Sequence, residues 1–99
     1  MSQRAKLLDR WRTNTPVDAP REQVGGILEY FFPGQYTWQT GGSSHYIVRD
    51  ERLKNMKECG PGGEFSIPVR SGKRVIRVYL KRLVEVIDFI EQRVNHEDT

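Results

Sequence analysis

Apolar residues recur at helical spacing near both ends of this chain. Residues 4–13 predict a short amphipathic helix, and its apolar positions are Ala5, Leu7, Leu8 and Trp11. A stripe of about five helical turns closes the chain at Ile76, Leu80, Leu83, Ile87, Ile90 and Val94. This stripe fits either a helix that covers a sheet or a short coiled-coil seam. We favour core packing, because the strands predicted between these helices need a cover.

A second helix is predicted to open near Asp18, with Pro20 in its first turn, because aspartate caps helices and proline suits the first helical position. Its core-facing positions follow the i, i+3, i+4, i+7 pattern at Val24, Ile27, Leu28 and Phe31. Gly25 and Gly26 each weaken a helix by about 1 kcal/mol relative to alanine. We therefore expect this helix to pack closely against a sheet.

Three short segments rich in β-branched and aromatic residues lie between the second and the last helix, at residues 36–38, 46–48 and 65–69. Gly41 and Gly42 predict a hairpin turn between the first two segments. Pro68 cannot donate to a ladder, so the third strand is expected at an edge. The predicted fold is α+β, a three-stranded antiparallel sheet with helices packed on one face, in the order α-α-β-β-β-α.

The 99 residues suffice for one domain with a modest core. We expect a helical extension at residues 1–20, the main domain at 21–94, and a polar tail at 95–99 that contains His96. Cys59 is the single cysteine, which fits a reducing compartment, and no apolar run is long enough to span a bilayer. The N-terminus also lacks a signal-peptide core, so a cytoplasmic location without membrane contact is expected.

Positive charge gathers where the last helix is expected to begin. The net charge is only +3, yet six cations occur without an acidic residue among them, namely Arg70, Lys73, Arg74, Arg77, Lys81 and Arg82. Cations oppose the macrodipole at a helix N-terminus, whereas a bound phosphate would be stabilised by the cations and by the helix N–H groups. We favour phosphate binding over a face that serves only solubility. Tyr36, Trp38 and Tyr46, with Arg49 nearby, could stack on unpaired bases or belong to the core.

His45 is the candidate for acid–base chemistry, because histidine exchanges protons near neutral pH. On an alternating strand it shares a face with Ser43, Ile47 and Arg49, and if Ile47 faces the helices, the imidazole lies at the rim of the covered face. A lone histidine is also often a structural residue, and that alternative stays open. The sequence has no pair of ligand residues at metal-binding spacing and no Gly-x-Ser-x-Gly turn, so we expect neither a metal nor a cofactor.

One reaction suits a single imidazole among cations. RNA carries its own nucleophile, the 2′-hydroxyl group, so its cleavage needs neither a covalent enzyme intermediate nor a metal. A histidine that acts as general acid or base contributes a factor of about 10²–10⁴ in rate. Arginine or lysine would stabilise the charge on the phosphorane-like transition state.

Residues 42–46 read Gly-Ser-Ser-His-Tyr, residues 67–69 read Ile-Pro-Val, and a helix follows. This arrangement, over roughly residues 21–92, resembles the HicA toxins of bacterial type II toxin–antitoxin pairs. The resemblance implies a double-stranded-RNA-binding-domain-like fold and an endoribonuclease that cuts messenger RNA with the histidine of a Gly-Ser-His motif. It makes His45 the catalytic candidate, with Ser44 in the adjacent motif position and Gly41 and Gly42 as the motif glycines.

The sequence departs from the family pattern at three places. Ser43 is inserted between the motif glycine and the Ser-His pair, and Arg70 stands where many members have a histidine. Residues 78–80 replace the usual Gly-Thr-Leu entry to the last helix. The opening residues 5–10 look like the leader of a longer branch of the family.

The leading hypothesis is a metal-independent endoribonuclease toxin with His45 as general acid or base. Its expected partners are a small acidic HicB-like antitoxin, which would cover the basic surface, and messenger RNA bound by Arg49, Arg70, Lys73, Arg74, Arg77 and Lys81. A monomer or a weak dimer is expected for the chain alone. Two alternatives are a non-catalytic RNA-binding module on the same fold and a protein-interaction domain that pairs through the last helix.

Overall fold

The computed structural model describes residues 2–41 and 43–97, with the side chains of residues 93–97 left out. Over these residues the chain is a small α+β domain with three α-helices and two antiparallel sheets, as the predicted class requires. The elements in order are α1 (Gln3–Thr13), β1 (Asp18–Pro20), α2 (Arg21–Phe31), β2 (Tyr36–Gln39), β3 (Ser44–Arg49), the 3₁₀ turn η1 (Glu51–Leu53), β4 (Glu64–Val69), β5 (Arg74–Ile76) and α3 (Arg77–Glu97).

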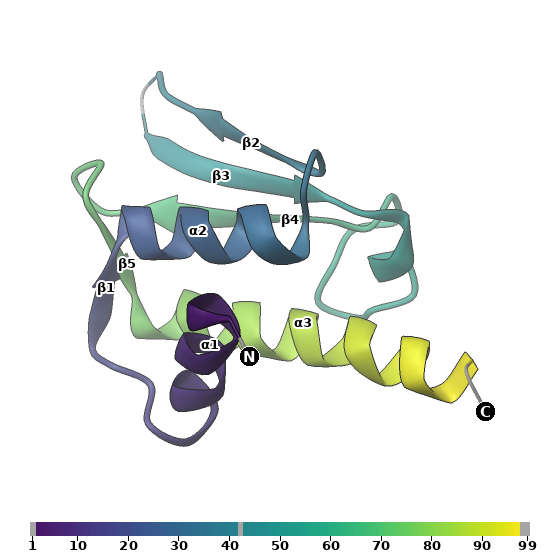
Figure 1. The fold of residues 1–99 in the computed structure, drawn as a ribbon. Coiled ribbons are helices and arrows are strands. Elements are labelled where there is room, and N and C mark those ends of the chain that lie inside the picture. Colours follow the sequence, from purple (N-terminus) through teal and green to yellow (C-terminus); the bar gives the residue numbers. More distant parts are fainter. Residues whose placement is uncertain (1, 42, 98–99) are drawn as a thin grey trace.

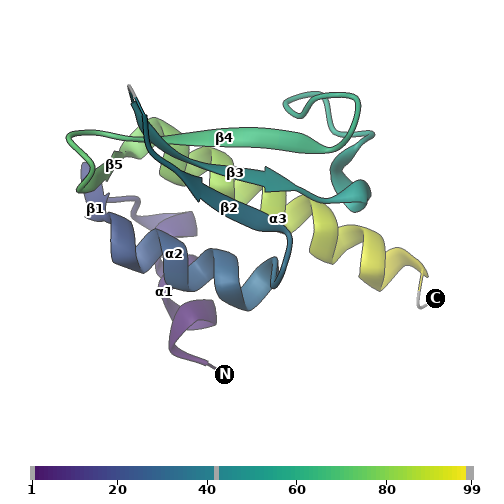
Figure 2. The same cartoon turned by 90° about the horizontal axis from the view of Figure 1, so that it is seen from above.

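The larger sheet has the strand order β2-β3-β4, and α2 and α3 pack against one of its faces (Figures 1 and 2). Alternate side chains of the central strand, Tyr46 and Val48, are buried on that face. Phe65, Ile67 and Val69 of β4 are buried beside them. The prediction for Pro68 is confirmed, because β4 is an edge strand of this sheet.

A second, two-stranded sheet was not predicted, and it changes the start of α2. Asp18 to Pro20 pair with Arg74 to Ile76, so the element order is α-β-α-β-β-β-β-α. Asp18 is therefore a strand residue and not a helix cap, and α2 begins at Arg21. Burial of Ala19, which pairs with Val75, holds this segment extended. The prediction of a helix opening near Asp18 was wrong for that reason.

The apolar stripe of the last helix lies in the core of the chain itself. Leu80, Leu83 and Ile87 are fully buried, which confirms core packing over a coiled-coil seam. Ile76 belongs to β5, and the helix proper begins at Arg77. It continues through residue 97, into the segment predicted as a polar tail. None of the helices in the described segments combines the length and the hydropathy that a bilayer crossing requires.

The predicted N-terminal extension is joined to the rest of the domain. Leu8 and Trp11 of α1 are buried, and the Arg12 guanidinium donates to Asp88 of α3 at 2.9 Å. That pairing raises the pKa of Arg12, chiefly through the hydrogen bond to Asp88. The strand β1 then leads from α1 into α2 (Figure 1). Residues 2–20 therefore pack on the rest of the chain through both a helix and a strand.

Close packing of α2 on the sheet is confirmed at Gly25. A Cβ atom at this position would lie 2.7 Å from the Tyr46 hydroxyl oxygen and 3.5 Å from the ring carbon that carries it. The same hydroxyl donates to the backbone carbonyl of Arg21 at 3.3 Å. Helix and strand therefore meet at a contact that only glycine permits without displacement of the tyrosine.

Substitution of Gly25 by alanine tests this contact. The overpacking cost of about 1–3 kcal/mol exceeds the gain of about 1 kcal/mol in helix propensity, so Gly25→Ala should lower the free energy of unfolding. In the Tyr46→Phe background the hydroxyl is gone, and the same substitution should be neutral or stabilising. Urea unfolding of the four proteins measures the coupling. An equal cost of Gly25→Ala in both backgrounds would contradict the contact.

Candidate nucleic-acid interface

His45 lies on the face of the larger sheet that α2 and α3 leave uncovered in the described structure. We call this the open face, and its side chains are Thr37, Gln39, His45, Ile47, Arg49, Glu64, Ser66 and Pro68. The neighbours of His45 across the strands are Gln39 on β2 and Pro68 on β4. The condition that Ile47 faces the helices is not met, because Tyr46 and Val48 occupy that side. His45 is therefore on the solvent side of the sheet, at the hairpin end.

The imidazole is partly exposed, and one ring nitrogen is engaged. Nδ1 of His45 lies 3.3 Å from the carbonyl oxygen of Ser43. A carbonyl oxygen only accepts hydrogen bonds, so this contact requires the proton on Nδ1. In the neutral ring Nε2 then carries a lone pair and can accept a proton. The arrangement suits a group that exchanges protons with a ligand on the open face.

Ser44 and His45 do not form a pair. Consecutive residues of a strand point to opposite faces, and Ser44 lies on the helix side of β3. Its hydroxyl oxygen would be 3.8 Å from a Cβ atom built at Gly72, in the turn before β5. The motif serine therefore lies against the Ser71–Gly72 turn, whose two residues have φ of 53° and 69°. Its position indicates a structural role and gives it no access to the open face.

Gly41, one of the two predicted motif glycines, lies in the turn between β2 and β3. Gly41 has φ of +124°, in the region that favours glycine, and open space surrounds its Cα. Gly42, the other predicted motif glycine, lies outside the described residues. Gly41 is thus needed by the backbone of the turn that presents β3.

Arg49 shares the open face with His45 but is far from it. Four residues of strand separate the two, which is roughly 13 Å of rise. The Arg49 guanidinium donates to the Glu64 carboxylate at 2.8 Å, across the β3–β4 pair. The ion pair uses part of the hydrogen-bonding capacity of the Arg49 guanidinium and holds that group towards β4. It does not meet His45.

Arg70 is better placed than Arg49 to act beside His45. It follows β4 by one residue and stays extended, since it bridges to Arg74. Arg70 is two positions beyond Pro68, the partner of His45, so strand alternation puts it on the same side as the imidazole. Such diagonal neighbours are roughly 7–8 Å apart, within the span of a long side chain. Arg70 is exposed and has no ion-pair partner among the described residues.

The turn after Arg70 brings further positive charge to this end of the sheet. The Lys73 carbonyl accepts from the backbone N–H of Arg21 at 2.8 Å, which joins this turn to the start of α2. The Arg21 guanidinium lies over the Trp38 ring at 4.6 Å. We call Arg21, Arg70 and Lys73 the basic belt. Sequence reasoning did not include Arg21 among the site residues. Its place beside Lys73 follows only from the hydrogen bond that joins the turn to α2.

Two of the predicted phosphate ligands have structural roles. Arg74 forms an ion pair with Asp18 across the β1–β5 pair. The Arg77 Nε donates to the carbonyl oxygen of Pro16 at 3.2 Å. Lys81, one turn after Arg77 on α3, is exposed. The six cations are therefore spread over the turn after β4, over β5 and over α3, since α3 begins only at Arg77.

The aromatic residues on the sheet face α2 and not the solvent side. The ring centroids of Trp38 and Tyr36 lie 4.8 Å and 6.1 Å from that of Tyr46. Burial raises the pKa of Tyr46, and the hydrogen bond to Glu29 raises the pKa of Tyr36, so both phenols stay protonated at neutral pH. Of the two sequence alternatives, membership of the core is the one observed.

Groups of three or more histidine, cysteine, aspartate or glutamate residues that could hold a metal ion do not occur within residues 2–41 and 43–97. The two motifs that resemble the HicA toxins meet in the sheet, since His45 pairs with Pro68. No protein-family model, curated protein or solved structure matches this chain.

Proposed function

We propose that this chain is a HicA-like endoribonuclease that cleaves RNA with His45 as general acid or base. One observation carries the proposal. The His45 ring is partly exposed on the open face, its Nδ1 is engaged by the Ser43 carbonyl, and the basic belt lies at the same end of the sheet. Within this proposal the fold is of the double-stranded-RNA-binding-domain type, which the order α2-β2-β3-β4-α3 and the one-sided helices support.

The proposed reaction uses the 2′-hydroxyl of RNA as nucleophile. Nε2 of His45 accepts the 2′-hydroxyl proton, and the 2′ oxygen forms a bond to the adjacent phosphorus. The bond from phosphorus to the 5′ oxygen breaks, and that oxygen takes a proton from the imidazolium or from water. The products are a 2′,3′-cyclic phosphate and a 5′-hydroxyl end. The step needs no oxidant and no metal.

Arg70 is the cation proposed to stabilise the charge on the phosphorus-bound oxygens. A guanidinium aimed at developing charge lowers a barrier more than one that is already paired. Arg70 is unpaired among the described residues, whereas Arg49 is bound to Glu64. Lys73 and Arg21 would hold the neighbouring phosphates, with Lys81 further along α3.

The expected protein partner is a small acidic antitoxin of the HicB type. An acidic surface laid over His45 and the basic belt would exclude RNA, and opposite charge would speed its association. This partner belongs to the proposal and follows from the family resemblance.

A non-catalytic RNA-binding module is the second candidate, and one observation favours it. Ser44 points away from His45, and Arg49 is engaged by Glu64, so among the described residues no second catalytic side chain is in direct contact with His45. In this alternative His45 contacts RNA without moving a proton. Pairing through the last helix has less support, because its apolar stripe is buried in the core.

Replacement of His45 by alanine separates these candidates. The nuclease proposal predicts a loss of cleavage of about 10²–10⁴-fold and relief of growth arrest on expression, because the proton acceptor is gone. RNA affinity should change only a few-fold. Thr37→Ala, also on the open face, is the matched control and should keep full activity. Growth arrest that survives His45→Ala would show that the mechanism assigned to His45 is wrong.

Substitutions of Arg70 and Arg49 should differ in their effect on the rate of RNA cleavage. Arg70→Gln should reduce the cleavage rate constant at saturating RNA by about 10²-fold, because an unpaired guanidinium near the reacting phosphate is removed. Arg49→Gln should change it less than about 3-fold, since that guanidinium is already bound to Glu64 and lies far from His45. Single-turnover cleavage assays give both values. A larger effect at Arg49 than at Arg70 would refute this assignment.

A further inference from the structure

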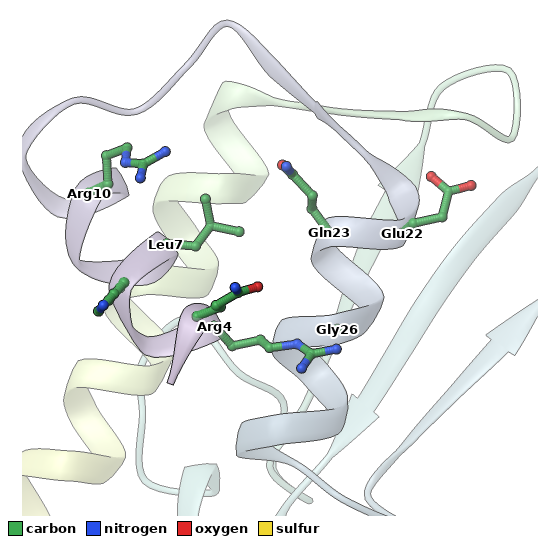
Figure 3. Close-up of a pocket in the computed structure, with 8 residues that line it drawn as sticks. Arg4, Leu7, Arg10, Glu22, Gln23 and Gly26 are labelled. Atoms are coloured by element: carbon green, nitrogen blue, oxygen red, sulfur yellow. The ribbon is translucent and has the colours of Figure 1, made fainter. Parts of the chain in front are cut away.

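A hollow of about 610 Å³ lies between α1 and α2, away from the open face (Figure 3). Its α1 wall carries the cations Arg4, Lys6 and Arg10, and Gln23 faces it from α2. Figure 3 shows Arg4 and Arg10 on the α1 side with Leu7 between them, while Glu22 points away from α1. We call this hollow the α1–α2 groove. Three cations converge there with one acidic residue at the rim.

The charges in this groove are unsatisfied. The side chains of Arg4, Lys6 and Arg10 have no hydrogen-bonded or ion-paired partner within the described part of the chain. The Arg4 side chain packs closely on α2 at Gly26, where a Cβ atom would lie 3.2 Å from the Arg4 Nε. A glycine in mid-helix thus admits a guanidinium over the α2 backbone. An anion in the groove would be attracted by these positive charges without having to displace a partner of theirs among the described residues.

The groove is continuous with the basic belt. Ser44, next to His45, lies against the turn at Gly72, and the following Lys73 is hydrogen-bonded to Arg21 at the start of α2. Glu22 and Gln23 come directly after Arg21 and reach the groove. A polyanion that runs from the open face at His45 to α1 would pass Lys73 and Arg21 of the basic belt and then Glu22, which is ion-paired with Arg21 at 3.9 Å, before it reaches Arg4 and Arg10.

We propose that the α1–α2 groove binds the sugar–phosphate backbone of the RNA strand beyond the segment held at His45. The inference rests on the proposed function for the identity of the polyanion. Guanidinium groups bind phosphates through two parallel hydrogen bonds, and amides such as Gln23 pair with ribose hydroxyls or base edges. A positively charged groove that follows the backbone is the common mode for unpaired nucleic acid. An acidic protein segment is the competing occupant, and binding of poly-glutamate distinguishes it from RNA.

The groove is tested by binding of two 2′-O-methyl RNAs that cannot be cleaved. One has roughly 4 and the other roughly 14 nucleotides, which lie within the range of single-strand site sizes. Arg4→Gln/Arg10→Gln should bind the long RNA several-fold more weakly at about 50 mM salt, with no change for the short one. The slope of log K against log salt should fall by about 1.4, or about 0.7 for each phosphate that the protein no longer neutralises.

Lys54→Gln/Lys57→Gln is the matched control. It also removes two positive charges, from the exposed loop that follows β3, at the other end of that strand from His45. Lys6→Gln/Arg10→Gln leaves Arg4 packed on Gly26 and should act in the same direction as the first variant. Thermal unfolding of each variant shows that it is folded.

Equal affinity and equal salt slope for the groove variants and the control variant would overturn the inference. So would groove variants that lose binding to poly-glutamate but keep RNA binding, a result that would assign the groove to an acidic protein. Since the probe RNAs lack a 2′-hydroxyl, the outcome is independent of cleavage. If the His45→Ala variant still cleaves RNA while the groove variants bind the long RNA more weakly, the role of His45 in catalysis is refuted and the role of the groove in RNA binding is supported.

Discussion

The contact between Tyr46 of β3 and Gly25 of α2 decides which face of the sheet carries the candidate chemistry. Side chains alternate along a strand, so burial of Tyr46 against the helix turns His45 to the opposite side. A slip of one residue would bury the imidazole and expose the tyrosine. The hydrogen bond from the Tyr46 hydroxyl to the Arg21 carbonyl ties the same contact to the start of α2. The register of β3 and the position of the basic belt therefore depend on one helix–strand contact.

The short pairing of β1 with β5 brings together groups that are distant in the sequence. It places Asp18 beside Arg74, and the turn before β5 is hydrogen-bonded to Arg21. The same turn lies against Ser44. The basic belt, at the start of α2 and in the turn before β5, thus lies between the hairpin end of the open face and the first turn of α2, which lines the α1–α2 groove. A single nucleic-acid strand could contact all three.

The sequence predicts much of this fold where the signal is periodic. The stripe of α3 and the core positions of α2 are strong repeats, and Leu80, Leu83, Ile87 and Ile90 of α3 are buried as predicted, as are Val24, Ile27 and Leu28 of α2. Ile76 instead belongs to β5, and Phe32 takes the buried position predicted for Phe31, which is only partly buried. β1 and β5 were missed because each has three residues and a partner more than fifty positions away, so neither shows a pattern of its own. The sequence also left the face of His45 open. Tyr46, Ile47 and Val48 form a continuous apolar run, and period-two alternation cannot choose between its two faces. Gly25 is the residue that bears on this choice, because a glycine in mid-helix is typical of a close helix–sheet contact, which the structure shows to be with Tyr46.

The chemistry of the cleaved RNA ends tests the role of the 2′-hydroxyl and of His45 most directly. Mass spectrometry of the products should find 2′,3′-cyclic phosphate or its hydrolysis product on one fragment and a 5′-hydroxyl on the other. A single 2′-deoxy nucleotide at the cleavage position should abolish the cut. Products with a 5′-phosphate and a 3′-hydroxyl, or undiminished cleavage beside the 2′-deoxy nucleotide, would contradict a mechanism in which an imidazole activates the substrate's own nucleophile.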